Sequence, residues 1–198
     1  MKLADVDLVL ASTSRYRREL LQRLTPRVRA LPPETDEARR PGEAPAALAR
    51  RLAAAKAQAV AGQAAGALVI GSDQVADRDG RVLGKPGDEA TARAQLAACS
   101  GAVVVFHTAV CLLDLRGDVP VAYTAADLTE VFFRPLAADE IARYVARERP
   151  LDCAGSFKCE GLGIGLFERI ASDDPTALVG LPLIAVCRLL REAGVEVL

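Results

Sequence analysis

The segment ALVIGSD, residues 67–73, is a short apolar run that ends in polar residues. A continuous apolar run of this length favours a buried β-strand. We therefore expect a strand that presents Ser72, Asp73 and Gln74 at its carboxyl end. Open α/β sheets bind ligands at that end of their strands, so this segment marks the first candidate site.

The chain upstream of this strand predicts another strand, two helices and a long loop. LVLAS, residues 8–12, is a second buried-type strand, and RRELLQRL, residues 17–24, has apolar positions at helical spacing. The next segment, LPPETDEARRPGE at residues 31–43, holds three prolines and predicts an exposed loop. The alanine-rich residues 44–60 favour a long helix that ends at Gly62.

The chain downstream predicts a hairpin turn, a helix and two long strands. DRDG, residues 77–80, is typical of a β-turn. Residues 84–99 predict a loop followed by a helix that Asp88 caps. Two stretches rich in β-branched and aromatic residues favour paired antiparallel strands, at residues 102–114 and 121–133.

The last third of the chain predicts two helices around a glycine-rich loop. Residues 136–148 favour a helix that Pro150 stops. CAGSFKCEGLGIG, residues 153–165, has a glycine density that favours close backbone approach to a ligand. A final apolar helix is expected over residues 176–193. The elements together predict a three-layer, mixed-sheet α/β fold in a single domain, residues 1–198.

The composition is typical of a soluble cytoplasmic enzyme. The chain mixes 25 basic and 26 acidic side chains, for a net charge of -1. Without a basic block, no nucleic-acid polymer is expected as a partner. The sequence shows neither a signal-peptide pattern nor an apolar run long enough for a bilayer, so no membrane partner is expected. The scattered cysteines predict reduced thiols: Cys99, Cys111, Cys153, Cys159 and Cys187.

The only histidine, His107, lies in the middle of a predicted strand, where a structural role is the better interpretation. That leaves no histidine for a Ser-His-Asp set and excludes a multi-histidine metal site. Catalysis must then depend on carboxylates, lysines, arginines and a hard metal ion.

Hydroxyl and guanidinium groups gather at the start of the first predicted helix. The segment ASTSRYRRELL, residues 11–21, includes Ser12, Arg17 and Arg18. Exposed backbone N–H groups, hydroxyls and guanidinium groups together suit a polyphosphate. A plain serine cap with solvated arginines is the alternative interpretation.

Carboxylates form a second group of candidates. Asp73 follows a predicted strand, and Asp36 and Glu37 lie in the proline-rich loop. Such carboxylates can hold Mg²⁺ or Mn²⁺ against phosphate oxygens, or take a proton from an attacking water. For the loop pair, two solvated acidic side chains are the alternative.

Two lysines complete the candidates. Lys56 lies on the alanine-rich helix, and Lys85 lies in LGKPGD, between a glycine and a proline. A stiff turn of this kind suits a single positive charge aimed at a phosphoryl group, although Lys85 alone resembles any surface lysine. LGKPG lacks the spacing of a P-loop, which disfavours kinase or GTPase chemistry.

Taken together, seven segments in this order resemble the Maf family of nucleotide pyrophosphatases over nearly the whole chain: ASTSRYRRELL, TDE, RLAAAKA, IGSDQV, LGKP, CAGSFKCEGLG and LVGLPL. The resemblance implies a Maf/ITPase-like fold with a cleft between two lobes. The SDQ and AGSFK-EG versions look like the branch that hydrolyses 7-methyl-GTP. Arg15 and Cys159 depart from the residues common in the family, which are proline and serine.

The resemblance also implies roles for individual residues. Asp73 matches the proton acceptor for the nucleophilic water, and the catalytic positions are Asp73, Lys85, Lys56 and Glu37. Glu37 and Asp73 match the positions for a divalent cation, which can be Mg²⁺, Mn²⁺ or Co²⁺. Ser12, Arg17 and Arg18 match substrate-binding positions.

Base specificity is implied at three further positions, Tyr16, Gln74 and Glu160. Methylation at N7 gives guanine a positive charge, which favours stacking on the electron-rich face of Tyr16. Glu160 can accept hydrogen bonds from the guanine N1–H and the exocyclic amine, which uracil and thymine do not offer.

The expected activity is therefore hydrolysis of a small nucleotide, 7-methyl-GTP, to 7-methyl-GMP and diphosphate. Two alternatives remain open. One is a pyrophosphatase for dTTP, UTP or another non-canonical nucleotide, and the other is a nucleotide-binding regulator of septum formation. The resemblance also implies that two copies can form a homodimer.

Overall fold

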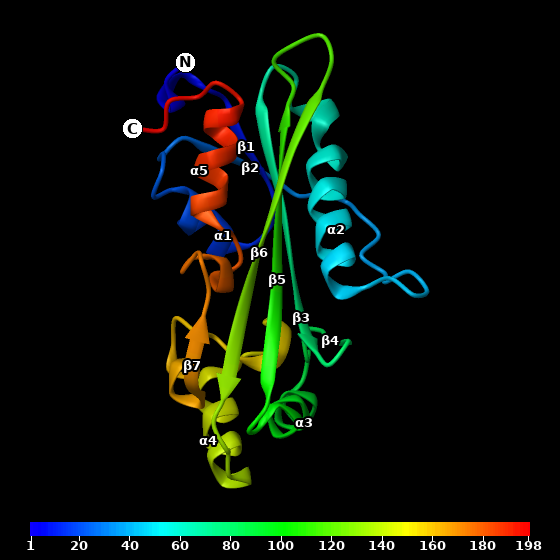
Figure 1. Ribbon diagram of the computed structural model, residues 1–198, viewed down its shortest axis with the longest axis vertical. Helices are drawn as coiled ribbons and strands as arrows, with labels where there is room; N and C mark the ends of the chain where they lie inside the picture. Colours follow the sequence, from blue (N-terminus) through cyan, green and yellow to red (C-terminus); the bar gives the residue numbers. More distant parts are fainter.

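The structure, a computed structural model, describes residues 1–198 and consists of a long mixed sheet covered by helices (Figure 1). The strand order is β2-β1-β3-β5-β6-β7, and β4 pairs with β3. The strands are β1 (Leu8–Ala11), β2 (Val28–Leu31), β3 (Leu68–Arg78), β4 (Arg81–Leu83), β5 (Val103–Asp114), β6 (Val121–Phe133) and β7 (Phe167–Ala171).

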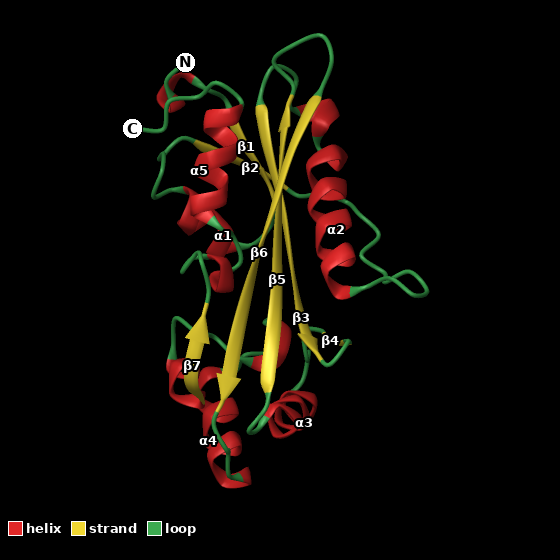
Figure 2. Cartoon of the chain, viewed as in Figure 1, coloured by secondary structure: helices red, strands yellow, loops and turns green.

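The α-helices are α1 (Arg15–Leu21), α2 (Pro45–Ala59), α3 (Glu89–Cys99), α4 (Ala138–Glu148) and α5 (Leu183–Glu192). Short 3-10 turns lie at η1 (Leu3–Asp5), η2 (Ala61–Gln63), η3 (Ala154–Ser156), η4 (Leu162–Leu166) and η5 (Ala177–Val179). Figure 2 shows how these helices flank the sheet along its length. None of the helices is both long enough and apolar enough to cross a membrane.

One half of the molecule has the predicted three layers. Successive residues of β1 point to opposite faces of the sheet, as strand geometry requires. Leu8 and Leu10 pack with α1 and α5, whereas Val9 and Ala11 pack with α2. Figure 1 shows α5 and α2 on opposite sides of the sheet. Both faces are therefore buried here, which explains why the strand is an uninterrupted apolar run.

The other half is a second lobe built on the far ends of β5 and β6, with α3, α4 and β7 around them. Four phenylalanines form its centre in edge-to-face contacts, with ring centroids 4.8 to 5.6 Å apart: Phe106, Phe133, Phe157 and Phe167. Phe157 belongs to the glycine-rich loop. Aromatic packing therefore fixes that loop to the sheet.

The strand β3 is longer than predicted, which changes the position of Asp73. β1 pairs with β3 only as far as Gly71, whereas β5 continues to pair with it as far as Asp77. The prediction that Asp73 follows the end of its strand was wrong, because the antiparallel partner extends the strand. Since β1 stops at Ala11 and β4 joins only at Ala76, one edge of β3 is open beside Asp73.

Several local predictions are confirmed. Arg78 pairs with Arg81 across a two-residue turn, in which Asp79 and Gly80 have φ angles of 52° and 81°. The Asp88 carboxylate accepts the Thr91 N–H at 2.8 Å and so caps α3. The two long strands pair antiparallel as expected. All five cysteines are free thiols.

Other boundaries differ from the predictions. The last helix begins at Leu183 instead of residue 176, because Gly180 has a φ of 121° and Pro182 precedes the helix. The alanine-rich helix ends at Ala59, and a 3-10 turn follows it. The first helix ends at Leu21. β2 and β7 were not predicted, because each is a short edge strand with charged residues in its apolar pattern.

Candidate active site

A cavity of about 710 Å³ lies between the two lobes, beside the open edge of β3. Segments far apart in the sequence form its wall. The predicted residues that line it are Ser12, Tyr16, Arg17, Glu37, Lys56, Asp73, Gln74, Lys85 and Glu160. Arg18 is the exception, because it is exposed on α1 and does not line the cavity. The fold therefore brings nearly all the candidates together.

Lys56 joins the two candidate carboxylates at the floor of the cavity. Its Nζ lies 2.7 Å from Asp73 Oδ1 and 2.7 Å from Glu37 Oε1. Lys56 is in the last turn of α2, which packs on β3, whereas Glu37 extends from the loop before α2. The Asp73 side chain is 10% exposed and that of Glu37 is 58% exposed. The cluster therefore runs from a buried floor to an open rim.

Burial and charge act against each other on these groups. Burial raises the pKa of the Asp73 carboxyl, although Lys56 and Arg17 oppose the shift. Burial also acts to raise the pKa of Glu37, but Lys56, Lys85 and Arg17 outweigh it and the pKa is lowered. Glu37 is thus held as an anion, whereas Asp73 has increased affinity for a proton.

Two cations line the same cavity as this acidic pair. Arg17 is half-buried, and its Nε donates to the Gly180 carbonyl at 2.8 Å. Burial lowers the pKa of its guanidinium, against the attraction of Asp73 and Glu37. Lys85 is exposed after β4 and makes no ion pair within the chain. Both cations are therefore available to an anionic ligand.

The loop before α1 is shaped by serine hydroxyls. Ser12 is buried, and its Oγ accepts the Ser14 N–H at 3.1 Å. Ser14 Oγ in turn accepts the Arg17 N–H at 3.4 Å, so Ser14 is the helix cap. The Ser12 hydroxyl hydrogen faces no acceptor in the chain and remains available to a ligand in the cavity.

Tyr16, on α1, and Glu160, in the glycine-rich loop, both line the cavity. Arg15 lies over the Tyr16 ring, 4.7 Å from its centroid, and donates to the Tyr16 hydroxyl at 2.9 Å. Arg15, the departure from the family pattern, thus binds Tyr16. Glu160 is exposed, and Cys159 Sγ donates to its Oε2 at 3.3 Å. One carboxylate oxygen of Glu160 remains free.

Gln74 borders the cavity, but its amide nitrogen is already in use. Nε2 donates to Thr108 Oγ1 and to the carbonyls of Ala177 and Leu178, at 2.9 to 3.1 Å. Two carbonyl acceptors fix which end of the amide is the nitrogen. Any contact of Gln74 with a base would therefore go through Oε1.

Two other sequence candidates have local structural partners. Asp36 Oδ1 accepts the Ala38 N–H at 2.9 Å and lies outside the cavity. His107 is half-buried, with Nε2 3.4 Å from Asp77 Oδ2. This agrees with the structural role expected for His107.

The Maf-like protein family profile matches residues 7–193. The chain belongs to the Maf family. Curated relatives of this Maf chain named "7-methyl-GTP pyrophosphatase" include one from Xanthomonas oryzae pv. oryzae (strain MAFF 311018), 62% identical over 94% of this chain and 96% of its own. Another, from Burkholderia pseudomallei (strain 1710b), is 56% identical over 94% of this chain and 87% of its own.

A solved structure supports the fold assignment. The Staphylococcus aureus Ham1 protein superposes with a TM-score of 0.50 over 94% of the Maf chain and 99% of its own, at 14% identity. The similarity concerns the fold alone. Together with the family match, it confirms the predicted mixed α/β fold.

The sequence analysis missed one polar part of this Maf site. The backbone of residues 178–180 lines the cavity, and the Gly180 carbonyl holds Arg17. The signal was present, because this turn belongs to LVGLPL, a segment to which no role was given. Gly180 has a φ of 121°, a conformation that favours glycine.

Proposed function

We propose that the chain hydrolyses 7-methyl-GTP to 7-methyl-GMP and diphosphate. The observation that carries the proposal is the buried Lys56–Asp73 pair, which lines one cavity together with Arg17 and Lys85. The names of relatives at 56–62% identity over most of their lengths support the same activity.

The triphosphate tail would bind between Arg17 and Lys85. A guanidinium and an ammonium offer donors and positive charge to phosphate oxygens, and the Gly180 carbonyl orients Arg17 before the substrate arrives. The Ser12 hydroxyl would donate a further hydrogen bond. Arg18 would contribute only to the surrounding potential, since it lies outside the cavity.

Asp73 would accept the proton of the attacking water. Its raised pKa makes it a stronger base than a solvated aspartate, and the contact with Lys56 keeps it ionised and oriented. The water oxygen forms a bond to the α-phosphorus as the bond to the α,β-bridging oxygen breaks. Pyrophosphate then leaves with the electron pair of that bond.

The two carboxylates fit a divalent cation of the Mg²⁺, Mn²⁺ or Co²⁺ type. Lys56 uses one oxygen each of Glu37 and Asp73, which leaves a second oxygen on each for a hard cation. No group of three or more His, Cys, Asp or Glu side chains converges in the chain. Mg²⁺ is typically held by one or two carboxylates together with phosphates. When bound, the cation would supply positive charge against the phosphate oxygens.

The base would lie between Tyr16 and Glu160. The two oxygens of the exposed Glu160 carboxylate would accept hydrogen bonds from the guanine N1–H and the exocyclic amine. Arg15 covers one side of Tyr16, which leaves the other side for the methylated ring. The cationic base would then contact the Glu160 carboxylate, and the anionic triphosphate tail would contact Arg17 and Lys85.

A panel of triphosphates, assayed for released pyrophosphate with Mg²⁺, Mn²⁺ and Co²⁺ in parallel, tests the proposal. The kcat/KM for 7-methyl-GTP should exceed that for dTTP and UTP by roughly tenfold or more, the discrimination that hydrogen bonds to a base can give. It should also exceed that for GTP, because only the methylated ring has the positive charge that favours stacking on Tyr16. A higher kcat/KM for dTTP or UTP than for 7-methyl-GTP would favour a pyrophosphatase for dTTP, UTP or another non-canonical nucleotide. Nucleotide binding without pyrophosphate release would instead support a regulator.

A further inference from the structure

A short turn, Ala177–Gly180, connects the sheet to the arginine of the cavity. This turn precedes α5 and contains η5. Its last carbonyl, that of Gly180, accepts Arg17 Nε at 2.8 Å. Gly180 also donates its N–H to the Ala177 carbonyl at 2.9 Å, which closes the turn. The position of the guanidinium therefore depends on the position of this turn.

Three polar side chains dock the turn on the sheet, and one of them, Ser72 on β3, places its Oγ 3.1 Å from Gly180 O. Gln74 and Thr108 lie directly opposite each other on β3 and β5. Gln74 Nε2 donates to Ala177 O at 2.9 Å and to Leu178 O at 3.1 Å, and Thr108 Oγ1 donates to Ala177 O at 3.1 Å. Thr108 Oγ1 also accepts from Gln74, so the two side chains form one network.

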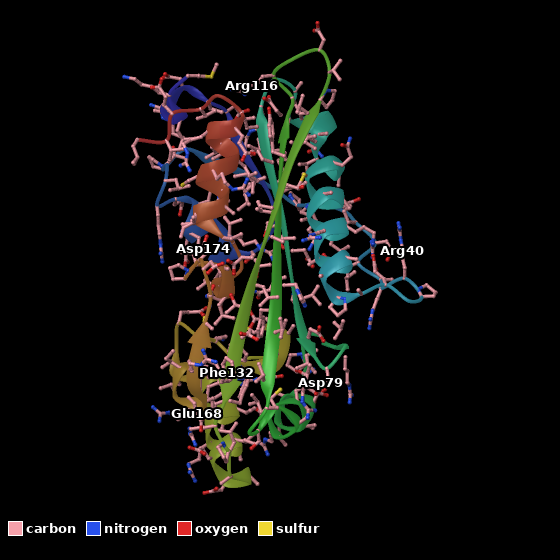
Figure 3. The ribbon with its side chains drawn as sticks, in the orientation of Figure 1. Arg40, Asp79, Arg116, Phe132, Glu168 and Asp174 are labelled. Carbon is pink, nitrogen blue, oxygen red and sulfur yellow. The ribbon has the colours of Figure 1, made fainter.

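The other side of the turn is anchored by Asp174, which lies beside the start of α5 (Figure 3). Asp174 is 3% exposed and accepts the Thr176 N–H at 2.9 Å and the Ile184 N–H at 2.6 Å. Thr176 Oγ1 donates to Leu181 O. The turn is thus fixed at both ends, and its Gly180 carbonyl, which holds Arg17, also lies 3.1 Å from the buried Ser72 hydroxyl of β3.

We propose that Gln74 and Thr108 are positioning residues for Arg17, which they hold in the cavity by docking the Ala177–Gly180 turn. The proposal rests on the proposed function in one respect, that Arg17 binds the polyphosphate tail. It gives Gln74 a role at the tail end of the substrate, separate from the base. It also gives the LVGLPL segment a part in phosphate binding.

Thr108 offers the sharper test, because it is fully buried and does not line the cavity. Thr108→Val keeps the shape of the side chain and removes the hydroxyl, whereas Thr108→Ser keeps the hydroxyl. The probe is inorganic tripolyphosphate, which has no base, and its Kd is measured by calorimetry with Mg²⁺. Thr108→Val should weaken binding about fivefold, as for one lost hydrogen bond, and Thr108→Ser should bind within twofold of wild type.

A double-mutant cycle shows whether the effect passes through Arg17. In an Arg17→Gln background, Thr108→Val should cause no further loss of tripolyphosphate affinity. The same fivefold loss in both backgrounds would overturn the proposal, as would full affinity in Thr108→Val or no binding by wild type. The melting temperature of Thr108→Val shows whether this variant folds. If it does not, Gln74→Met is compared in the wild-type and Arg17→Gln backgrounds in its place.

Hydrolysis separates this proposal from the proposed function. With 7-methyl-GTP and GTP, Thr108→Val and Gln74→Met should raise KM by the same factor for both substrates, with a smaller change in kcat. A loss confined to 7-methyl-GTP would place Gln74 at the base and contradict the proposal. A wild-type chain that binds tripolyphosphate as predicted but releases no pyrophosphate would end the proposed function and leave this proposal standing.

Discussion

Lys56 Nζ lies 2.7 Å from Asp73 Oδ1, and the two side chains are only 8% and 10% exposed. A buried charge pair is costly to form, because both ions lose hydration, and it is costly to break, because one ion is then left unpaired. The pair is therefore a weak source of stability and a strong means of fixing where Asp73 points. A catalytic base needs that orientation.

Replacing Lys56 by methionine should show the cost of leaving the buried Asp73 without its partner. Asp73 would lose its partner while remaining buried, so the free energy of unfolding should fall by about 3 kcal/mol. Urea denaturation measures the change. Lys85→Met is the matched control, because Lys85 is exposed and its loss should cost less than about 0.5 kcal/mol. Equal stability losses in the two variants would contradict the burial argument.

The pH dependence of kcat/KM should show the raised pKa of Asp73. Asp73 accepts a proton only when ionised, and the ionised fraction falls as pH falls through its pKa. Because that pKa is raised, the acid limb should have its midpoint above 3.8, the ordinary value for aspartate. The lowered pKa keeps Glu37 ionised through this limb. A midpoint at or below 3.8, with the fold intact by circular dichroism, would contradict this assignment.

Gly71 permits the close approach of α2 to β3. A Cβ at this position would lie 2.2 Å from Ala53 O and 2.6 Å from Ala57 N, both backbone atoms of α2. Gly71→Ala must therefore displace the helix that carries Lys56, and we expect a loss of roughly 3 kcal/mol in unfolding free energy. Gly62→Ala is the control, since a Cβ there meets nothing within 4 Å. Similar melting temperatures for both variants would count against this packing.

Glu160 should determine the choice of base. Glu160→Gln replaces one acceptor oxygen by a donor, so kcat/KM for 7-methyl-GTP should fall about 10- to 100-fold, with dTTP changed less than twofold. Glu168→Gln is the control, because Glu168 is an exposed glutamate on β7, away from the cavity (Figure 3). An equal loss for both nucleotides would assign Glu160 a structural role.

Local patterns predicted much of this fold. The apolar run at β1, the spacing in α4 and the DRDG turn depend on neighbours along the chain, and all three are confirmed. The central position of Asp73 in β3 was missed, because it results from pairing with β5, where its partner Ala109 lies 36 residues further along the chain. Long-range pairing of this kind leaves no local signal.

The site was predicted in its residue types more than in its contacts. Carboxylates and lysines at suitable segments indicated a polyphosphate site, and the cavity brings them together. The sequence could not reveal that Lys56 bonds both Asp73 and Glu37, nor that Gln74 points its amide nitrogen at the Ala177 carbonyl. Those contacts depend on how α2 and the turn before α5 pack on the sheet.

The removal of Asp73 as a base is the most direct test of the account. Asp73→Asn keeps the size of the side chain and removes its capacity to accept a proton, so pyrophosphate release from 7-methyl-GTP should fall by at least about 10²-fold. The melting temperature should stay close to that of wild type, because Lys56 keeps its contact with Glu37 at 2.7 Å. Turnover within a few-fold of wild type in Asp73→Asn would contradict the central claim that this buried carboxylate activates the attacking water.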